Sequence, residues 1–221
     1  MNLLLFILTL LTTLSLALLS FRLGKSIFFA YIGAIGTLTF FLAPMVVNMF
    51  GFPFAMMEIF YATIFLSTDM VAEHQGSKEA RMIIWVAVVV GLTIGLVTQL
   101  AILFIPHSSD FVQPHIKALL AISPRILIAS FIMFIVEQHF DIWFFHKLKM
   151  ITGGKRLWLR NNLSTMTSQL IDVLGFYPLA FYGVYENIFQ LMIAAYVFKV
   201  CMALIDTPFM YLSHIIKKSD V

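Results

Sequence analysis

The sequence predicts an all-α integral membrane protein with about seven transmembrane helices. Apolar residues make up 61% of the 221 residues, charged residues only 11%, and the mean hydropathy is +0.97. Soluble domains are about 45–50% apolar and about 25% charged, so this chain is not an ordinary soluble domain. A bilayer core of about 30 Å requires about 20 apolar residues in a helix, because unsatisfied peptide groups are costly in lipid.

Seven stretches are long and apolar enough to be such helices. They cover residues 2–21, 26–47, 52–72, 82–105, 126–145, 161–183 and 188–213. The polar material lies between them, in stretches such as "EHQGSKEAR" and "KLKMITGGKRLWLR". Nothing is left over for a soluble domain. We therefore expect a single transmembrane domain over residues 1–221, in which residues 1–21 form an extra first helix.

The distribution of Lys and Arg predicts the orientation of these helices. Eleven of these cations fall on one side of a seven-helix arrangement, namely Arg22, Lys25, Lys78, Arg81, Lys147, Lys149, Lys155, Arg156, Arg160, Lys217 and Lys218. Lys117 and Arg125 fall on the other side, and Lys199 lies within the last helix. The cation-rich side is expected to be cytoplasmic, with the amino terminus outside and the carboxyl terminus cytoplasmic. Because these cations flank apolar segments, their expected partner is membrane lipid rather than nucleic acid.

Polar residues follow one face of the predicted helix at 161–183. Asn161, Thr165, Ser168, Gln169 and Asp172 recur at steps of one, three or four, which places them on one stripe. A rise of about 1.5 Å per residue puts Asp172 about 16 Å from Asn161, near the bilayer centre. Ionisable side chains cost about 3 kcal/mol or more at this depth, so the stripe is expected to face the protein interior.

The predicted helix at 188–213 repeats this pattern, because Lys199, Ala203 and Asp206 share a face. Pro178 and Pro208 each free a backbone carbonyl near an acidic residue, and such breaks can form ligand sites. Further ionisable groups lie on other predicted helices: Glu58 and Glu137 nearer the middle, Asp69 and Asp141 in the cytoplasmic halves, and Arg125 at the outer mouth.

Two interpretations of these groups stay open. They can satisfy one another as buried structural pairs, for example Asp172 with Lys199. They can also line a watered cavity, which the excess of acids over a single internal lysine favours. Because a carboxylate pair can hold a proton at rest, the charges alone do not decide between proton coupling and facilitated diffusion.

No metal or cofactor is expected from the sequence. His139, Asp141 and His146 lie near one membrane surface, but they lack the His pair with an intervening Glu that helical zinc hydrolases use. Cys201 is the single cysteine, so neither a disulfide framework nor a cysteine metal site is available. "GSKEAR" and "TGGKR" lack the spacing of a phosphate-binding loop.

Several blocks between residues 50 and 211 carry a family resemblance. They are "STDMVAEHQGSKEAR"; Arg125, Ala129, Ser130, Gln138 and Asp141; "GKRLWLRNNLSTMTSQLID"; and "YVFKVCMALIDTPFMYL". With these blocks the chain resembles the queuosine precursor transporter family, also called the vitamin uptake transporter family. Glu137 departs from the family pattern, which has a small or uncharged residue there, and this departure could alter substrate or ion preference. The first helix is absent from some relatives.

The resemblance implies import of 7-cyano- or 7-aminomethyl-7-deazaguanine across the bacterial cell inner membrane, for salvage into the queuosine of transfer RNA. A carboxylate can accept the ring N–H and amine donors of such a base, and Gln, Asn or Lys can donate to its carbonyl. Phe176 or Tyr196 could stack on the ring. The expected substrate-binding residues are Asp172, Gln169, Lys199, Asp206, Asp69, Asn162, Glu58 and Gln138. Arg160, Asn161, Asp141, Glu137 and Arg125 are expected to have gating or structural roles.

Two other functions are kept as alternatives, together with two open properties. The first is a substrate-binding membrane subunit that needs a separate energising partner. The second is an intramembrane enzyme that uses Asp69, Asp141 and Asp172 as acid and base, although no nucleophile or metal constellation supports it. A homodimer and a proton as the coupling ion also stay open.

Overall fold

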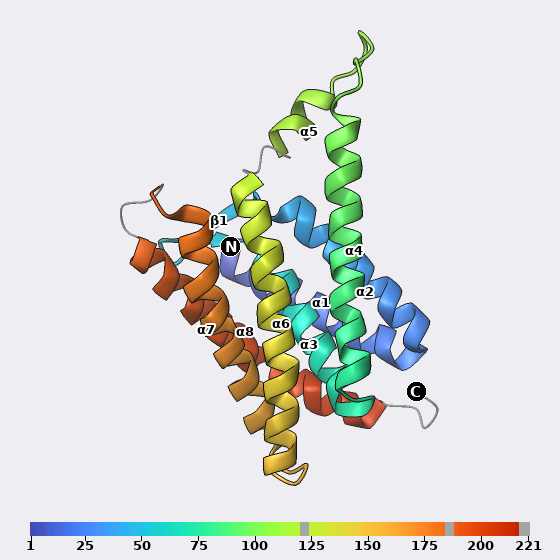
Figure 1. Cartoon of the computed structure of the whole chain (residues 1–221), viewed down its shortest axis with the longest axis vertical. Helices are drawn as coiled ribbons and strands as arrows, with labels where there is room; N and C mark the ends of the chain where they lie inside the picture. Colours follow the sequence, from blue (N-terminus) through green and yellow to red (C-terminus); the bar gives the residue numbers. More distant parts are fainter. Residues whose placement is uncertain (120–123, 184–187, 217–221) are drawn as a thin grey trace.

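The computed structural model describes residues 1–119, 124–183 and 188–216. Within these residues the chain forms eight α-helices and one two-stranded hairpin, packed into one bundle (Figure 1). The elements in chain order are α1 (Asn2–Leu23), α2 (Lys25–Leu42), β1 (Val46–Met49), β2 (Phe52–Ala55), α3 (Met57–His74), α4 (Ser77–Ala101), α5 (Gln113–Leu119), α6 (Pro124–Ile151), α7 (Leu157–Phe181) and α8 (Ile188–Ile216).

In the part of the chain that the structure describes, five helices are long and apolar enough to cross a membrane: α1, α2, α4, α6 and α8. Their outer faces are apolar as well. On α4, for example, Trp85, Val89, Leu92 and Leu96 are all exposed, at steps of three or four residues. A continuous apolar stripe of this size is unfavourable in water but fits the hydrocarbon of a bilayer. The fold is therefore that of a multi-pass, predominantly α-helical membrane protein.

The first helix packs against α2, α3 and α8. Leu10, Leu14, Ala17 and Phe21 are buried along one face of α1. A polar contact adds to this interface, because the Thr63 hydroxyl of α3 donates to the Thr13 hydroxyl at 2.9 Å. The residues predicted as an extra first helix thus contribute to the interior of the bundle.

A β-hairpin replaces the helical ends predicted around residue 50. The predicted helix at 26–47 ends at Leu42, and the one predicted at 52–72 begins only at Met57. Between them β1 and β2 pair antiparallel. Pro44 and Pro53 each lack a backbone N–H, which disfavours continuation of either helix through this segment. The prediction of helix at 43–47 and 52–56 is wrong because hydropathy alone does not distinguish an apolar strand from an apolar helix.

The hairpin turn has the backbone geometry of a two-residue type I′ turn. Phe50 and Gly51 have φ angles of 54° and 86°, and a type I′ turn requires positive φ at both central residues. The Gly51 N–H donates to the Asn48 side-chain oxygen at 2.9 Å. The two positive φ angles and this hydrogen bond therefore define the turn, although the strands that it joins are apolar.

Other boundaries differ by a few residues. Helix α4 begins five residues before the predicted 82 and ends four before the predicted 105. Helix α6 continues six residues beyond the predicted 145. Helix α5, in the segment predicted as a connection, was not expected. The predicted ranges include only the apolar stretches, whereas the helices α4 and α6 also include the polar residues next to them.

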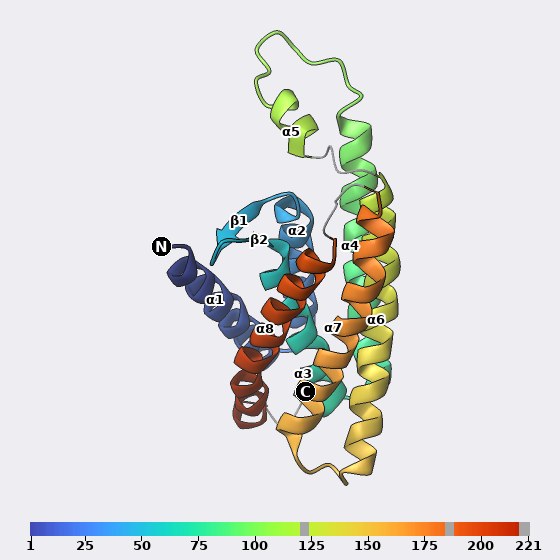
Figure 2. The same ribbon diagram turned by 90° about the vertical axis from the view of Figure 1, so that its left-hand side faces the viewer.

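The two ends of the bundle carry different connections. One end, which we call the hairpin end, carries β1, β2 and α5 and lies in the upper half of Figures 1 and 2. The other end, which we call the basic end, carries the turns at 75–76 and 152–156. At the basic end the Lys149 ammonium of α6 donates to the Glu73 carbonyl of α3 at 2.7 Å. The helices therefore run between two chemically distinct surfaces.

The hairpin turn generates a stability prediction. Gly51→Ala places a Cβ on a residue with positive φ and should destabilise the protein by about 1–2 kcal/mol. Gly33→Ala in α2 is the matched control, because its Cβ would make an ordinary contact with Val90 at 3.6 Å. Thermal unfolding of the two purified variants in detergent measures the difference. Equal Tm values would contradict the assigned turn.

Candidate functional site

The polar stripe of α7 faces the interior of the bundle. Asn161, Thr165, Ser168, Gln169 and Asp172 are all buried, whereas Leu163, Leu170 and Leu174 of the same helix are exposed. Each of the five stripe residues contacts a polar partner on a neighbouring helix. The stripe therefore brings polar groups of α3, α6 and α8 together in a line along one face of α7.

The Lys199 ammonium of α8 lies at one end of this line and holds a cluster of acceptors. Its Nζ atom donates to Gln169 Oε1 at 2.6 Å and to Asp172 Oδ2 at 2.9 Å, both on α7. Glu58 of α3 completes the cluster, with Oε2 at 3.1 Å from the same nitrogen. Burying an ammonium is costly unless it is paired and hydrogen-bonded, and here it is both. We call Glu58, Gln169, Asp172 and Lys199 the lysine cluster.

Three further carboxyl groups lie closer to the basic end. Asp206 accepts a hydrogen bond from the Asn161 amide at 3.0 Å, and Asp141 accepts one from the Ser168 hydroxyl at 3.0 Å. Asp69 accepts a longer one from Thr165 at 3.4 Å, and it lies beside Asp141. All three acids are buried. Neutral donors of α7 thus bind acids of α3, α6 and α8.

A cavity of about 560 Å³ lies between the hairpin end and the lysine cluster. This is within the range of pockets that hold small organic ligands. Its lining includes Val46 and Ala55 of the hairpin, so β1 and β2 form part of its wall. At its inner end it reaches Glu58 and Tyr61, which also line a much smaller space beside Gln169 and Lys199. The cavity therefore leads to the lysine cluster.

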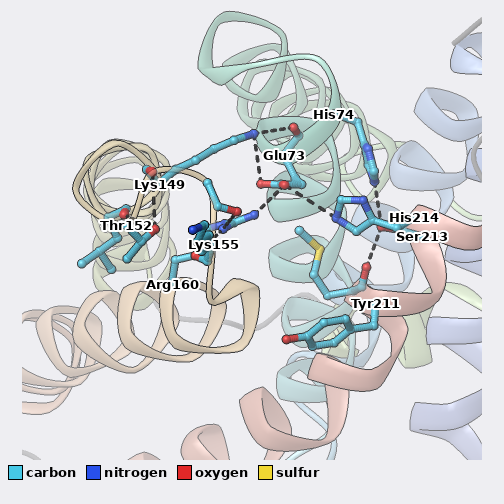
Figure 3. Close-up of polar contacts among 12 residues, drawn as sticks. Glu73, His74, Lys149, Thr152, Lys155, Arg160, Tyr211, Ser213 and His214 are labelled. Carbon is cyan, nitrogen blue, oxygen red and sulfur yellow. Dashed lines mark hydrogen bonds and ion pairs between the residues drawn. The ribbon is translucent and has the colours of Figure 1, made fainter.

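The opposite end of the stripe is closed by an ionic network around Glu73 (Figure 3). The Glu73 carboxylate at the end of α3 accepts from Arg160 Nη2 of α7 at 2.5 Å and lies 3.1 Å from Lys149 Nζ of α6. His214 of α8 has its Nε2 atom 3.6 Å from Glu73 Oε1, an ion pair when the imidazole is protonated. One carboxylate thus connects four helices at the basic end.

Arg160 is also bound to the connection that precedes its own helix. Its Nη1 atom donates to the carbonyls of Gly154 and Lys155 at 2.9 and 3.0 Å, and its side chain is almost fully buried. The guanidinium is therefore held by both charge and backbone acceptors, which suits its planar set of donors.

Arg125 has a comparable contact at the hairpin end. Its guanidinium donates to the carbonyls of Pro178, Leu179 and Tyr182, at 3.3, 2.6 and 3.0 Å. These carbonyls lie at the end of α7, where a helix leaves acceptors unsatisfied. Arg125 therefore joins the start of α6 to the end of α7.

The structure brings some of the predicted site residues together and separates others. Glu58, Gln169, Asp172 and Lys199 form the lysine cluster, and Asp206 lines the small space beside it. Asn162 instead binds Thr207 of α8 at 2.7 Å, away from the cavity. Gln138 is fully buried, and its amide has no hydrogen-bond partner among the described residues.

The sequence did not predict roles for Glu73, Tyr61 and Tyr177. Glu73 stands in one of the family-like blocks, but its partners lie 76 and 87 residues away along the chain. Tyr61 and Tyr177 line the cavity and were indistinguishable in sequence from packing residues. Of the two rings expected to stack on a base, Phe176 lines the cavity, whereas the Tyr196 hydroxyl donates to the Met166 carbonyl at 3.2 Å. Within the described part of the chain, no group of three or more His, Cys, Asp or Glu side chains is placed to hold a metal ion.

Comparison with known proteins identifies relatives over most of the chain. The family described as "Putative vitamin uptake transporter" matches residues 55–213. A "Probable queuosine precursor transporter" of Bacillus subtilis is 33% identical over 191 residues, covering 85% of this chain and 83% of the relative. The "Queuosine precursor transporter" of Escherichia coli is 26% identical over 171 residues, covering 75% of this chain and 74% of the relative.

No solved structure matches the chain. The family match nevertheless covers α3 to α7 and α8 as far as Ser213, and so includes the lysine cluster and all of the Glu73 network except His214. It supports the predicted transporter role and extends over more than half of the sequence. The chain therefore belongs to the vitamin uptake transporter family.

Proposed function

We propose that the protein imports queuosine precursors, 7-cyano- or 7-aminomethyl-7-deazaguanine, across the bacterial cell inner membrane for salvage into transfer RNA queuosine. The observation that carries this proposal is the cavity of about 560 Å³ that ends at the lysine cluster. Its aromatic lining suits a flat ring, and the cluster presents both donors and acceptors. The names of the relatives from B. subtilis and E. coli give queuosine precursors as the substrates of those proteins.

In this proposal the lysine cluster recognises the base. The Asp172 and Glu58 carboxylates accept from the ring N–H and exocyclic amine, while Lys199 or Gln169 donates to the ring carbonyl. Phe176 stacks on the ring. Of the lysine cluster, Glu58 lines the cavity, and Gln169, Asp172 and Lys199 lie directly behind it. The other predicted contacts meet the substrate only as it passes on; they are Asp69, Asp206, Asn162 and Gln138. Asp141 and Arg125 have structural roles.

The proposed topology has seven membrane spans, with α3 and α7 added to the five apolar helices. Both carry the polar stripe contacts, and their polar faces are buried, which is how lipid tolerates such segments. The cation-rich basic end is cytoplasmic, the amino terminus is outside and the carboxyl terminus is cytoplasmic. Of the cations that support this orientation, Lys217 and Lys218 lie outside the described residues. Residues 1–221 act as a single transporter domain.

The proposed cycle exposes the site alternately to the two sides of the membrane. The cavity lies toward the hairpin end and the Glu73 network occupies the basic end, which supports assigning this arrangement to the outward-facing state of the proposed cycle. Arg160 and Asn161 then belong to the inner gate, and Glu73 is the residue that closes it. Opening this gate requires the Glu73 contacts with α6, α7 and α8 to break.

Uptake in cells that lack their own deazaguanine synthesis tests the proposed substrate and site. Asp172→Asn and Lys199→Met each remove a charged partner, and charge-assisted hydrogen bonds contribute about 1.5–3 kcal/mol each, so uptake of radiolabelled base should fall about tenfold or more. Lys25→Met is the matched control, because Lys25 is half exposed and pairs with Glu79 at the surface.

Normal uptake by folded, membrane-inserted Asp172→Asn and Lys199→Met variants would contradict the site. An uncoupler separates the two energetic alternatives, because it abolishes accumulation only if transport is proton-coupled. Co-purification with an ATPase would instead favour the binding-subunit alternative, and a homodimer would appear in the same purification as a doubled mass.

Cysteine labelling tests the inner gate. In a Cys201→Ser background, Ser130→Cys places a thiol in the cavity lining. Glu73→Gln weakens the closed basic end, and a change of about 1–2 kcal/mol alters the ratio of two states about fivefold to thirtyfold. Labelling of this thiol by an impermeant maleimide outside intact cells should therefore decrease. Glu79→Gln is the control, because its carboxylate pairs only at the surface. Unchanged labelling in Glu73→Gln would contradict the gate.

A further inference from the structure

The walls of the cavity combine aromatic rings with a single type of charge. Its lining includes the rings of Tyr61, Phe134, Phe176 and Tyr177, and the Tyr61 and Phe134 ring centroids are 5.8 Å apart. Glu58 is the one charged side chain among the described residues of the lining. The faces of aromatic rings attract cations, and so does a carboxylate. These groups together form an environment that favours a positively charged ligand.

The inner end of the cavity also has more negative than positive groups. Glu58 and Asp172 both pair with Lys199, which leaves one formal negative charge for the three groups. Glu137 of α6 interacts electrostatically with all three of them. If all four groups are ionised, the formal charge is −2. Among the described residues, Lys199 is the cation that pairs with Glu58 and Asp172.

Unlike Glu58 and Asp172, Glu137 forms no ion pair with Lys199 among the described residues. It is 3% exposed, and its Oε2 atom has no hydrogen-bond partner among the described residues. Ser130 and Phe134 of the same helix line the cavity. Phe134 follows Ser130 by four residues and Glu137 follows Phe134 by three, so the three residues share one face of α6. Glu137 therefore continues the cavity-facing stripe of α6 by about one turn beyond the lining. A buried carboxylate in this position lacks the cation that would compensate its charge.

We infer that the cavity takes a flat organic cation, and that Glu137 together with Glu58 selects for its positive charge. This inference rests on the proposed function for the identity of the ring. Of the two proposed bases, the 7-aminomethyl compound carries a protonated amine, whereas the 7-cyano compound is neutral. The amine supplies the missing positive charge at the inner end of the cavity, next to aromatic faces. The 7-aminomethyl base is therefore the preferred substrate.

Binding of the two bases to the purified protein in nanodiscs tests this inference. The 7-aminomethyl base should bind at least tenfold more tightly than the 7-cyano base. Glu137→Gln and Glu58→Gln should each reduce this preference severalfold, mainly by weakening binding of the cationic base. Glu137→Asp, which retains the charge, should keep most of the preference. Glu79→Gln, at the surface of the basic end, should keep all of it.

Two results would overturn the inference. One is equal or tighter binding of the neutral base by the unaltered protein. The other is full retention of the preference by folded Glu137→Gln and Glu58→Gln variants, with folding judged by size-exclusion chromatography. A preference for charge that is lost in these variants but kept in Glu137→Asp supports it.

Failure of the proposed substrate would be recognised separately. If neither deazaguanine base binds, the proposed function is wrong, and the charge preference is then measured with benzamidine and benzamide, a cation and a neutral compound of similar shape. Tighter binding of benzamidine that depends on Glu137 supports the inference. Equal binding of the two compounds overturns it.

Discussion

The buried ammonium of Lys199 is the interaction on which the arrangement of the helices depends. It binds Glu58 of α3 and both Gln169 and Asp172 of α7, so three helices meet at one nitrogen atom. In a bilayer the alternative to these contacts is an unpaired charge in hydrocarbon, which is far more costly than in a water-soluble protein. The contacts fix the rotation of α7, and every other stripe residue then meets a partner on α3, α6 or α8.

The remaining polar groups divide the molecule into a half that contains the cavity and a half that is closed by polar contacts. Toward the hairpin end the interior is a cavity lined mainly by apolar and aromatic side chains. Toward the basic end it is filled by acids bound to Asn161, Thr165 and Ser168, and it finishes at the Glu73 network. The stripe of α7 therefore contributes side chains to both halves. The charged groups gather at two places, the lysine cluster at the end of the cavity and the Glu73 network at the basic end.

The sequence was sufficient for those parts of the fold and site that depend on periodicity within one helix. The inward orientation of Gln169 and Asp172, and the placement of Lys199 and Asp206 on one face, follow from spacing and from the cost of charge in lipid. The hairpin was not predictable from hydropathy, because Val46 to Ala55 is almost as apolar as the helices beside it.

Contacts between segments that are far apart in the sequence could not be predicted from residue spacing either. Asp141 with Ser168 and Glu73 with Arg160 are separated by 27 and 87 residues, and no pattern in one helix encodes such pairs. The roles of the site residues remain predictions, although the structure brings four of them around one ammonium group.

The contacts of Arg125 and Arg160 have a consequence for how the bundle can deform. Arg125, at the start of α6, binds the carbonyls that end α7, and Arg160 of α7 binds the carbonyls of the turn that leaves α6. The two helices are thus fastened to each other at both ends. A rearrangement that preserves these bonds has to carry α6 and α7 as one rigid unit, so the sliding surfaces lie against α3, α4 and α8 rather than between the two.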